Sequence, residues 1–254
     1  MWLQGELQLW QAGAVLAMAA LGAMLGVWCA QAALVYGRLL EADAHADAGS
    51  LLAALRIASR RKPGAALADA SPRVPSVVKW LSASILAIVF GAALAHYGFT
   101  PRSCLLMIAA TMLLLLAHID TNTRLLPDAL TLPLLWLGLG AAWLGWANIS
   151  LYDAVAGVMV GYGALWLLLQ GFRLLRGIEG MGYGDLKLVA ALGAWLGWQA
   201  LPWVLLAACL TGIVFAMVRH KTLFPSGAYP FGPFLAAAGA AVFMAAPGLH
   251  LYFY

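Results

Sequence analysis

Residues 180–197 read GMGYGDLKLVAALGAWLG, and they bring an acid, Asp185, to the edge of an apolar segment. A carboxylate beside hydrocarbon is costly, so an ionisable residue in such a place is a candidate for function. Glycine accepts backbone conformations that other residues avoid, and it lets two segments approach closely. We therefore expect Gly180, Gly182 and Gly184 to bring Asp185 against another segment, where a partner carboxylate can meet it.

Apolar residues dominate the whole chain. Of its 254 residues, 64% are hydrophobic and 9% are charged, and the mean hydropathy is +0.90. This composition indicates an integral membrane protein and excludes a water-soluble globule. The net charge of +4 therefore bears on orientation in the membrane. It is no sign of nucleic-acid binding, and we expect no partner of that class.

The three cysteines occupy separate apolar segments, at positions Cys29, Cys104 and Cys209, and no CxxC pair is present. A lone cysteine in such a segment is typically a small buried hydrophobe. Disulfide frameworks and zinc sites need paired or regularly spaced cysteines, so we expect neither. Hard cations would need a cluster of carboxylates at a dedicated spacing, which the sequence does not offer. No metal site is predicted.

Eight apolar segments are candidates for crossing a bilayer, for which an α-helix needs roughly 20 residues. The first lies near 11–36, and no basic signal-peptide region precedes it, so we expect it to stay in the membrane. Its Gly22 and Gly26 have the spacing of closely packed membrane helices, with scattered glycine as the alternative. The other seven segments lie near 80–99, 103–119, 129–147, 153–172, 186–200, 202–218 and 231–247. The predicted fold is an all-α polytopic membrane protein of about eight transmembrane helices.

Basic residues orient these segments in the membrane. With the N-terminus outside, 12 of the 14 lysines and arginines fall in cytoplasmic loops, as the positive-inside rule requires. Both termini are then outside, and residues 38–79 form the one larger cytoplasmic loop. Seven tryptophans lie near the predicted outer ends, as an interfacial belt would: Trp2, Trp10, Trp143, Trp146, Trp195, Trp198 and Trp203.

The loop of residues 38–79 contains a basic cluster, Arg60-Arg61-Lys62. Basic clusters on the cytoplasmic side of a membrane segment attract anionic lipids. We expect this cluster to lie near anionic headgroups of the bilayer. A docking site for an acidic protein partner is the alternative.

Three aspartates, Asp120, Asp128 and Asp185, fall at the same cytoplasmic face in this orientation. Two carboxylates a few ångström apart cannot both ionise cheaply, so they share a proton. The ionised member can then activate water as a general base, while the protonated member polarises a carbonyl group. Two such acids on different helices therefore suit aspartyl hydrolysis.

Three motifs in this order agree with one family. They are Asp120 followed by LLPDALTLPLLWLGL at 125–139, GMGYGDLKLVAALGAWLG at 180–197, and YPFGPF at 229–234. Together they closely resemble the bacterial type IV prepilin peptidases, which are intramembrane aspartyl proteases of the GxGD class. The resemblance covers roughly residues 105–245.

This resemblance implies an endopeptidase of the bacterial inner (cytoplasmic) membrane. Such an enzyme removes the basic leader of type IV prepilins, or of the pseudopilins of type II secretion, on the cytoplasmic side. The family's catalytic pair matches Asp120 and Asp185. The supporting residues expected around the pair are Asp128, Gly182, Gly184, Lys187 and Arg124. Arg124 and Lys187 are expected to favour the ionised form of the pair, with lipid phosphate contacts as the alternative.

The N-terminal third departs from the family's pattern. Many members carry two zinc-binding CxxC pairs in the first cytoplasmic loop, whereas residues 38–79 contain no cysteine. Residues 26–31, GVWCAQ, do not match the usual GSFLNVVIxR motif either. In the family this region is associated with N-methylation of the new pilin terminus by S-adenosylmethionine. We expect proteolysis without a cofactor, and methylation with S-adenosylmethionine stays open.

The predicted organisation has three parts, with both termini periplasmic. Residues 1–37 form the first transmembrane helix, residues 38–79 a cytoplasmic loop or small subdomain, and residues 80–254 a seven-helix membrane peptidase core. Two other functions remain open. A small proton- or cation-coupled transporter would use membrane acids near the midplane, whereas these acids lie at the cytoplasmic ends. An inactive pilus-assembly scaffold would not need both aspartates.

Overall fold

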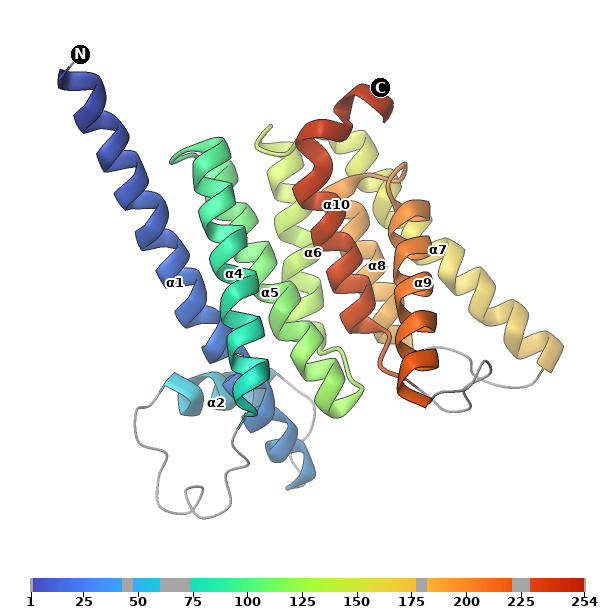
Figure 1. Ribbon diagram of the computed structural model, residues 1–254. Coiled ribbons are helices and arrows are strands. Elements are labelled where there is room, and N and C mark those ends of the chain that lie inside the picture. Colours follow the sequence, from blue (N-terminus) through green and yellow to red (C-terminus); the bar gives the residue numbers. More distant parts are fainter. Residues whose placement is uncertain (1, 43–47, 60–73, 177–181, 221–228, 254) are drawn as a thin grey trace. The chain divides into compact units, whose positions relative to one another are not determined.

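The described part of the computed structural model is helical (Figure 1). The structure describes residues 2–42, 48–59, 74–176, 182–220 and 229–253. The basic cluster Arg60-Arg61-Lys62 and the residues Gly180 and Met181 of the glycine-rich motif lie outside this described part. The chain divides into two compact units, Met1–His118 and Ile119–Tyr254.

The first unit contains α1 (Trp2–Glu41), α2 (Ala48–Ser59), α4 (Ser76–Tyr97) and most of α5 (Pro101–Thr123). Helix α1 packs along α4 and also against α2. A Cβ atom on Gly22 or on Gly26 would collide with a carbonyl oxygen of α4, at Leu86 and Ser82 respectively. The four-residue spacing of these glycines therefore serves close helix packing, as expected of a small-xxx-small pattern.

The second unit contains α6 (Asp128–Trp143), α7 (Leu151–Arg176), α8 (Tyr183–Leu196), α9 (Leu201–His220) and α10 (Gly232–Phe253). Helix α8 contacts all four of the others and lies among them in Figure 1. Its residues 188–195 are all buried, as is Leu186. A helix that is apolar on every side belongs in an interior. The centre of this unit is therefore the helix that begins with the GxGD motif.

Helices α7 and α8 approach each other closely through glycine. A Cβ atom on Gly157 of α7 would collide with the carbonyl oxygen of Gly193 of α8, and the reverse collision would occur at Gly193. One turn further along α7, a Cβ atom on Gly161 would lie 3.1 Å from the carbonyl oxygen of Val189. This second small-xxx-small contact was not predicted from the sequence.

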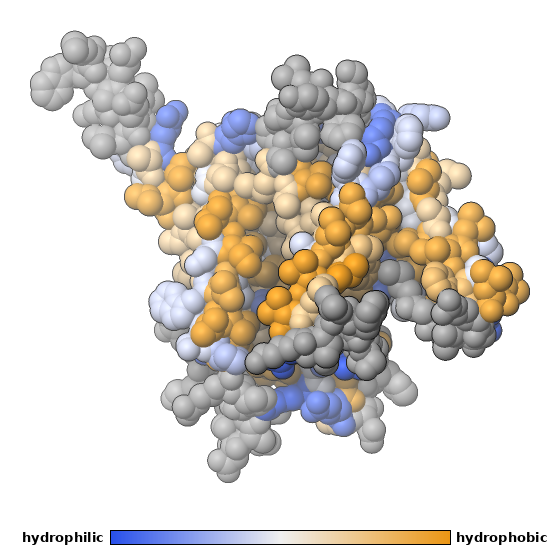
Figure 2. All heavy atoms as spheres, turned by 45° about the vertical axis from the view of Figure 1, so that its right-hand side comes forward, coloured by the Kyte–Doolittle hydropathy of each residue, from blue (hydrophilic) through white to orange (hydrophobic). Residues whose placement is uncertain are grey.

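Five helices are long and apolar enough to cross a membrane, so the chain is a multi-pass membrane protein. They cover Trp10–Glu41, Ser76–Tyr97, Pro101–Thr123, Leu151–Leu175 and Leu201–Arg219. Large apolar side chains stay exposed on these helices, among them Met159, Leu167, Leu174, Leu210 and Val218. Figure 2 shows orange, apolar atoms over much of one face. Soluble proteins rarely expose apolar patches of this extent, whereas lipid would cover them. The count of eight spans and their orientation stay predictions.

Two predicted segments prove longer than the helices that the structure contains. The segment at 129–147 was expected to continue past Trp143, where α6 ends, and the segment at 186–200 past Leu196, where α8 ends. Gly145 and Gly197 follow these ends with φ of 70° and 78°. A glycine in this conformation commonly ends a helix. Because the residues around each of these glycines are apolar, a hydropathy pattern does not reveal the helix end.

Trp195 departs from the predicted aromatic belt. Its side chain is only 8% exposed, and its indole N–H donates to the carbonyl oxygen of Leu134 in α6 at 2.8 Å. A Cβ atom on Gly138 would lie 2.8 Å from the indole ring, so α6 leaves room for it. Trp195 therefore locks α6 to α8. The other tryptophans of the belt whose side chains are described remain exposed: Trp10, Trp143, Trp146, Trp198 and Trp203.

Candidate active site

Asp120 lies in the last turn of α5 and is 4% exposed. Its Oδ2 atom accepts a hydrogen bond of 2.9 Å from the backbone N–H of Gly232, the first residue of α10. Both residues belong to the second unit. An ionised carboxylate needs donors when it leaves water, and a backbone N–H is a strong one. The first residue of the final helix, α10, is therefore hydrogen-bonded to the Asp120 side chain.

Asp185 lies in the first turn of α8, ahead of the apolar body of the helix and outside the five spanning segments. Burial and, secondly, the charge of Asp120 raise the pKa of Asp185 to about 7. Such repulsion weakens as the distance between two charges grows. Asp120 and Asp185, which are 65 positions apart in the chain, are therefore near enough for the charge of Asp120 to act on Asp185.

Gly184 gives the first turn of α8 the close approach that the motif predicts. A Cβ atom there would lie 2.9 Å from the Cβ of Leu126, in the loop between α5 and α6. The turn that carries Asp185 therefore packs on the loop that follows α5, and any larger residue at 184 would push the two apart. Gly182 has no such constraint: its φ is −75°, and the nearest atom to an added Cβ is Asp185 Oδ2 at 3.9 Å.

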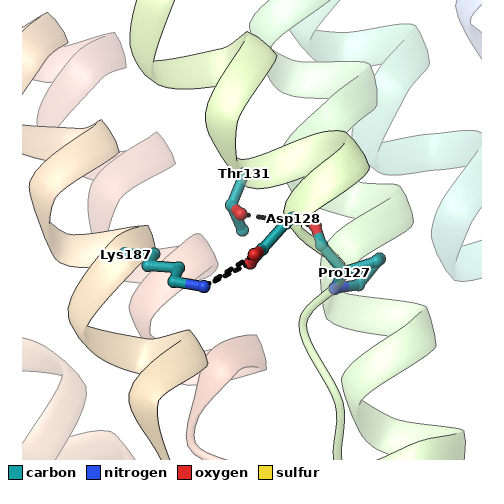
Figure 3. A network of polar contacts seen from close by, with 4 residues as sticks. All are labelled: Pro127, Asp128, Thr131 and Lys187. Carbon is teal, nitrogen blue, oxygen red and sulfur yellow. Dashed lines mark hydrogen bonds and ion pairs between the residues drawn. The ribbon is translucent and has the colours of Figure 1, made fainter. Parts of the chain in front are cut away.

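Lys187 forms an ion pair with Asp128 (Figure 3). Its ammonium group donates to Oδ1 at 2.6 Å and to Oδ2 at 2.7 Å. Asp128 is the first residue of α6, one position after Pro127, and Lys187 is on α8. The two side chains are 54% and 32% exposed, so the pair contributes at most about 1 kcal/mol to stability. The pair joins the first turn of α6 to the helix that carries Asp185.

Arg124 ends α5 in the left-handed backbone region, with φ of 56°. Its backbone N–H donates to the carbonyl oxygen of Asp120 at 2.8 Å, which closes the last turn of the helix. The charge of Arg124 also interacts with the Asp120 carboxylate. Arg124 is thus a counter-charge near the pair, whereas Lys187 neutralises Asp128.

The residues that the structure describes include no group of three or more His, Cys, Asp or Glu side chains that could hold a metal ion. His118, two positions before Asp120, shares a hydrogen bond of 2.7 Å with Ser82 through its Nε2 atom. All three cysteines are free, and Cys29 is buried as expected, but Cys104 and Cys209 are exposed, so the expectation of burial was wrong for these two. The expectation of a zinc-free protein remains a prediction.

Sequence reasoning missed the contact of Gly232 with Asp120. The motif at 229–234 contributed to the family resemblance, but the sequence predicted no role for any of its residues. A proline such as Pro233 just inside a helix start is a known signal, because its missing N–H would have no partner there. That signal locates the beginning of α10, but it does not predict which side chain accepts a hydrogen bond from the N–H of Gly232.

Known proteins resemble this chain over the same region. Residues 107–217 match the type IV leader peptidase family. A prepilin leader peptidase/N-methyltransferase of Burkholderia pseudomallei (strain K96243) is 51% identical over 154 residues, which are 59% of this chain and 46% of that protein. A protein of the same name from Aeromonas salmonicida is 55% identical over 130 residues, or 50% of this chain and 44% of that protein.

A third relative with this name, from Stutzerimonas stutzeri, is 43% identical over 185 residues, or 72% of this chain and 62% of that protein. The chain spans about half the length of the curated relatives it matches. No solved structure is significantly similar to it. The matched region contains Asp120, Asp128 and Asp185. The three aspartates thus lie in the part of the chain, residues 107–217, that is similar to the type IV leader peptidase family.

Proposed function

We propose that this protein is a membrane-embedded aspartyl endopeptidase that cleaves the basic leader from type IV prepilins or type II secretion pseudopilins. The observation that carries the proposal is the interaction between the Asp120 and Asp185 carboxylates inside the region that matches the leader peptidase family. The names of the relatives include this activity. The proposed location is the bacterial inner membrane, with cleavage at its cytoplasmic face.

The proposed topology has eight spans and two periplasmic termini. The five long apolar helices support several of these spans, and the distribution of lysine and arginine supports the orientation. In this orientation the last turn of α5 and the first turn of α8 open toward the cytoplasm. A pilin leader is basic and the segment after it is an apolar helix, so a site at this membrane surface can receive both parts.

The proposed reaction uses one proton shared by Asp120 and Asp185. With a pKa raised to about 7, Asp185 retains its proton at acid pH and loses it as the pH rises past about 7. Where one of the two groups is ionised and the other is not, the pair holds one charge and one proton. The charged member takes a proton from water, while the protonated member polarises the carbonyl group of the scissile peptide bond. This chemistry needs no metal ion.

N-methylation of the product is a separate matter. The relatives carry the term N-methyltransferase in their names, so S-adenosylmethionine is the co-substrate to test. The N-terminal region of this chain lacks the sequence pattern that the family associates with this step. The proposed reaction therefore does not include methylation. A product heavier by one methyl group would show that this second activity is present.

The function is tested by incubating the purified protein with a prepilin and measuring product masses. We expect release of the intact leader peptide and a mature pilin that begins directly after it. Adding S-adenosylmethionine increases the product's mass by one methyl group only if the second activity is present. A folded protein that leaves both prepilins and pseudopilins uncut would refute the proposed function.

The ion pair between Asp128 and Lys187 is expected to support cleavage without taking part in it. Because an exposed pair is worth at most about 1 kcal/mol, Asp128→Asn or Lys187→Gln should lower the cleavage rate by about fivefold or less. The charge swap Asp128→Lys with Lys187→Asp should recover part of the loss. Initial rates in membranes with equal amounts of protein measure both effects. If Asp128→Asn were as inactive as Asp185→Asn, Asp128 would belong to the catalytic pair.

A further inference from the structure

We infer that the backbone N–H of Gly232 holds Asp120 as the ionised, water-activating member of the pair, so that Asp185 is the member that carries the shared proton. This inference rests on the proposed hydrolytic function and assigns the two roles within it. It also makes Gly232, which lies outside the region matched by the family, a positioning residue of the site.

The contact between Gly232 and Asp120 is short, buried and specific to glycine. The N–H lies 2.9 Å from Oδ2 in a place that solvent does not reach. A Cβ atom on residue 232 would lie 2.7 Å from the same oxygen and 3.1 Å from the carboxyl carbon. Any other residue would displace the carboxylate or the helix start. A glycine at this position therefore permits the hydrogen bond.

A hydrogen bond from an N–H donor favours the charged form of a carboxyl group. An ionised carboxylate only accepts hydrogen bonds, and charge-assisted bonds are about twice as strong as neutral ones. The N–H of Gly232 can only donate a hydrogen bond, so this contact stabilises the ionised form of the Asp120 carboxyl group.

The charges around Asp120 agree with this assignment. Arg124, at the end of the same helix, is positive and favours an ionised Asp120. Asp185, facing it from α8, opposes a second negative charge and so keeps its own proton. The ammonium group of Lys187 pairs with Asp128. The counter-charge and the N–H donor thus both lie on the Asp120 side.

The helix ends act in the opposite direction but more weakly. Asp185 is in the first turn of α8, where the helix dipole favours a negative charge, and Asp120 is in the last turn of α5, where the dipole disfavours one. A direct hydrogen bond to a charged group outweighs the effect of a helix end by about threefold. The hydrogen bond from Gly232 therefore outweighs the helix ends, and it also acts against the burial of Asp120, which disfavours a charge.

These roles define the movement of protons during cleavage. Water loses a proton to Asp120 as its oxygen bonds to the scissile carbonyl carbon, and Asp185 gives its proton to the carbonyl oxygen. The resulting diol then collapses: Asp120 passes its proton to the amine nitrogen, the C–N bond breaks, and one diol hydroxyl returns a proton to Asp185. The pair ends as it began, with Asp120 ionised and Asp185 protonated.

The first test is the pH profile of cleavage by Gly232→Ala. The acid limb reports ionisation of the base, and the alkaline limb reports loss of the proton on the acid. Without the N–H contact, the acid limb should move up by about one to two pH units while the alkaline limb stays in place. The maximal rate should fall more than KM rises. An unchanged acid limb, or a shift of the alkaline limb alone, overturns the inference.

Gly212→Ala is the matched control for this substitution. Gly212 lies in α9, and an added Cβ would make only an ordinary contact of 3.5 Å with Phe234 of α10. Its pH profile should equal that of the wild type. A shift as large as that of Gly232→Ala would show that any perturbation of α10 has this effect, which would refute a specific role for Gly232.

The second test needs neither substrate nor the Gly232 variant. Infrared spectra of Asp185→Asn minus those of the double variant Asp120→Asn/Asp185→Asn isolate the Asp120 carboxyl group across a pH titration, and spectra of Asp120→Asn minus the double variant isolate that of Asp185. We expect the carboxylate band of Asp120 to appear at a lower pH than that of Asp185. The reverse order would overturn the assignment. If prepilins are not cut but the titration is as expected, the proposed function fails and the assignment of charge stands.

Discussion

Asparagine in place of either Asp120 or Asp185 is expected to abolish leader removal. The substitution keeps the size of the side chain but removes its ability to gain or lose a proton. General acid–base catalysis by a positioned group typically contributes about a hundredfold to ten-thousandfold. We expect losses in this range for each single variant. The double variant should be little worse than either, because each carboxyl group works only with the other.

Asp153→Asn is the matched control for these two substitutions. Asp153 is also a buried aspartate of the second unit, and its carboxylate accepts hydrogen bonds from Ser150 at 2.6 Å and from Gln199 at 3.0 Å. Its replacement disturbs a buried polar network but touches no proposed chemistry. Cleavage by Asp153→Asn should stay within several-fold of the wild type. Mass spectra of the products from membranes with equal amounts of each protein provide the comparison, and undiminished cleavage by Asp120→Asn or Asp185→Asn would end the assignment.

Side-chain type and order were enough to nominate the acids of the site. Asp120 and Asp185 stand out in the sequence because few other acids adjoin apolar segments, and the charge of Asp120 acts on Asp185 in the structure. The partner of Lys187 was beyond this reasoning. Its ammonium group was expected to act on the catalytic pair, yet the packing of α6 against α8 places it on Asp128. The carboxylate that pairs with a long side chain such as Lys187 depends on how the helices pack, and amino-acid composition does not predict that packing.

Backbone groups and helix ends were the other features that the sequence concealed. The N–H of Gly232 leaves no trace in a side-chain pattern, although it is the donor that reaches Asp120. Hydropathy predicted segments that continue past Trp143 and Leu196 because the residues after both helix ends are themselves apolar. Trp195 likewise has the composition of a belt residue, but its ring fills a space that Gly138 leaves open.

Leucine in place of Gly157 is expected to destabilise the second unit severely. The added side chain would collide with the backbone of α8 at Gly193, and a backbone cannot turn aside as a flexible side chain can. Overpacking usually costs about 1–3 kcal/mol, and a rigid neighbour places this substitution at or above the upper end. A loss of about 3 kcal/mol corresponds to a fall of roughly 6–12 °C in Tm. Because α8 carries Asp185, cleavage should fall with stability.

Gly163→Leu separates this steric effect from the mere loss of a glycine. Gly163 lies six positions further along the same helix, with no atom within 4 Å of an added Cβ. Leucine favours helix more than glycine by about 0.8 kcal/mol, so this variant should be as stable as the wild type or slightly more stable. Thermal unfolding in detergent compares the two variants directly. Equal Tm values for Gly157→Leu and Gly163→Leu would mean that α7 and α8 do not approach as closely as the Gly157–Gly193 contact requires. The close packing of α7 would then not explain how α8 holds Asp185 in position.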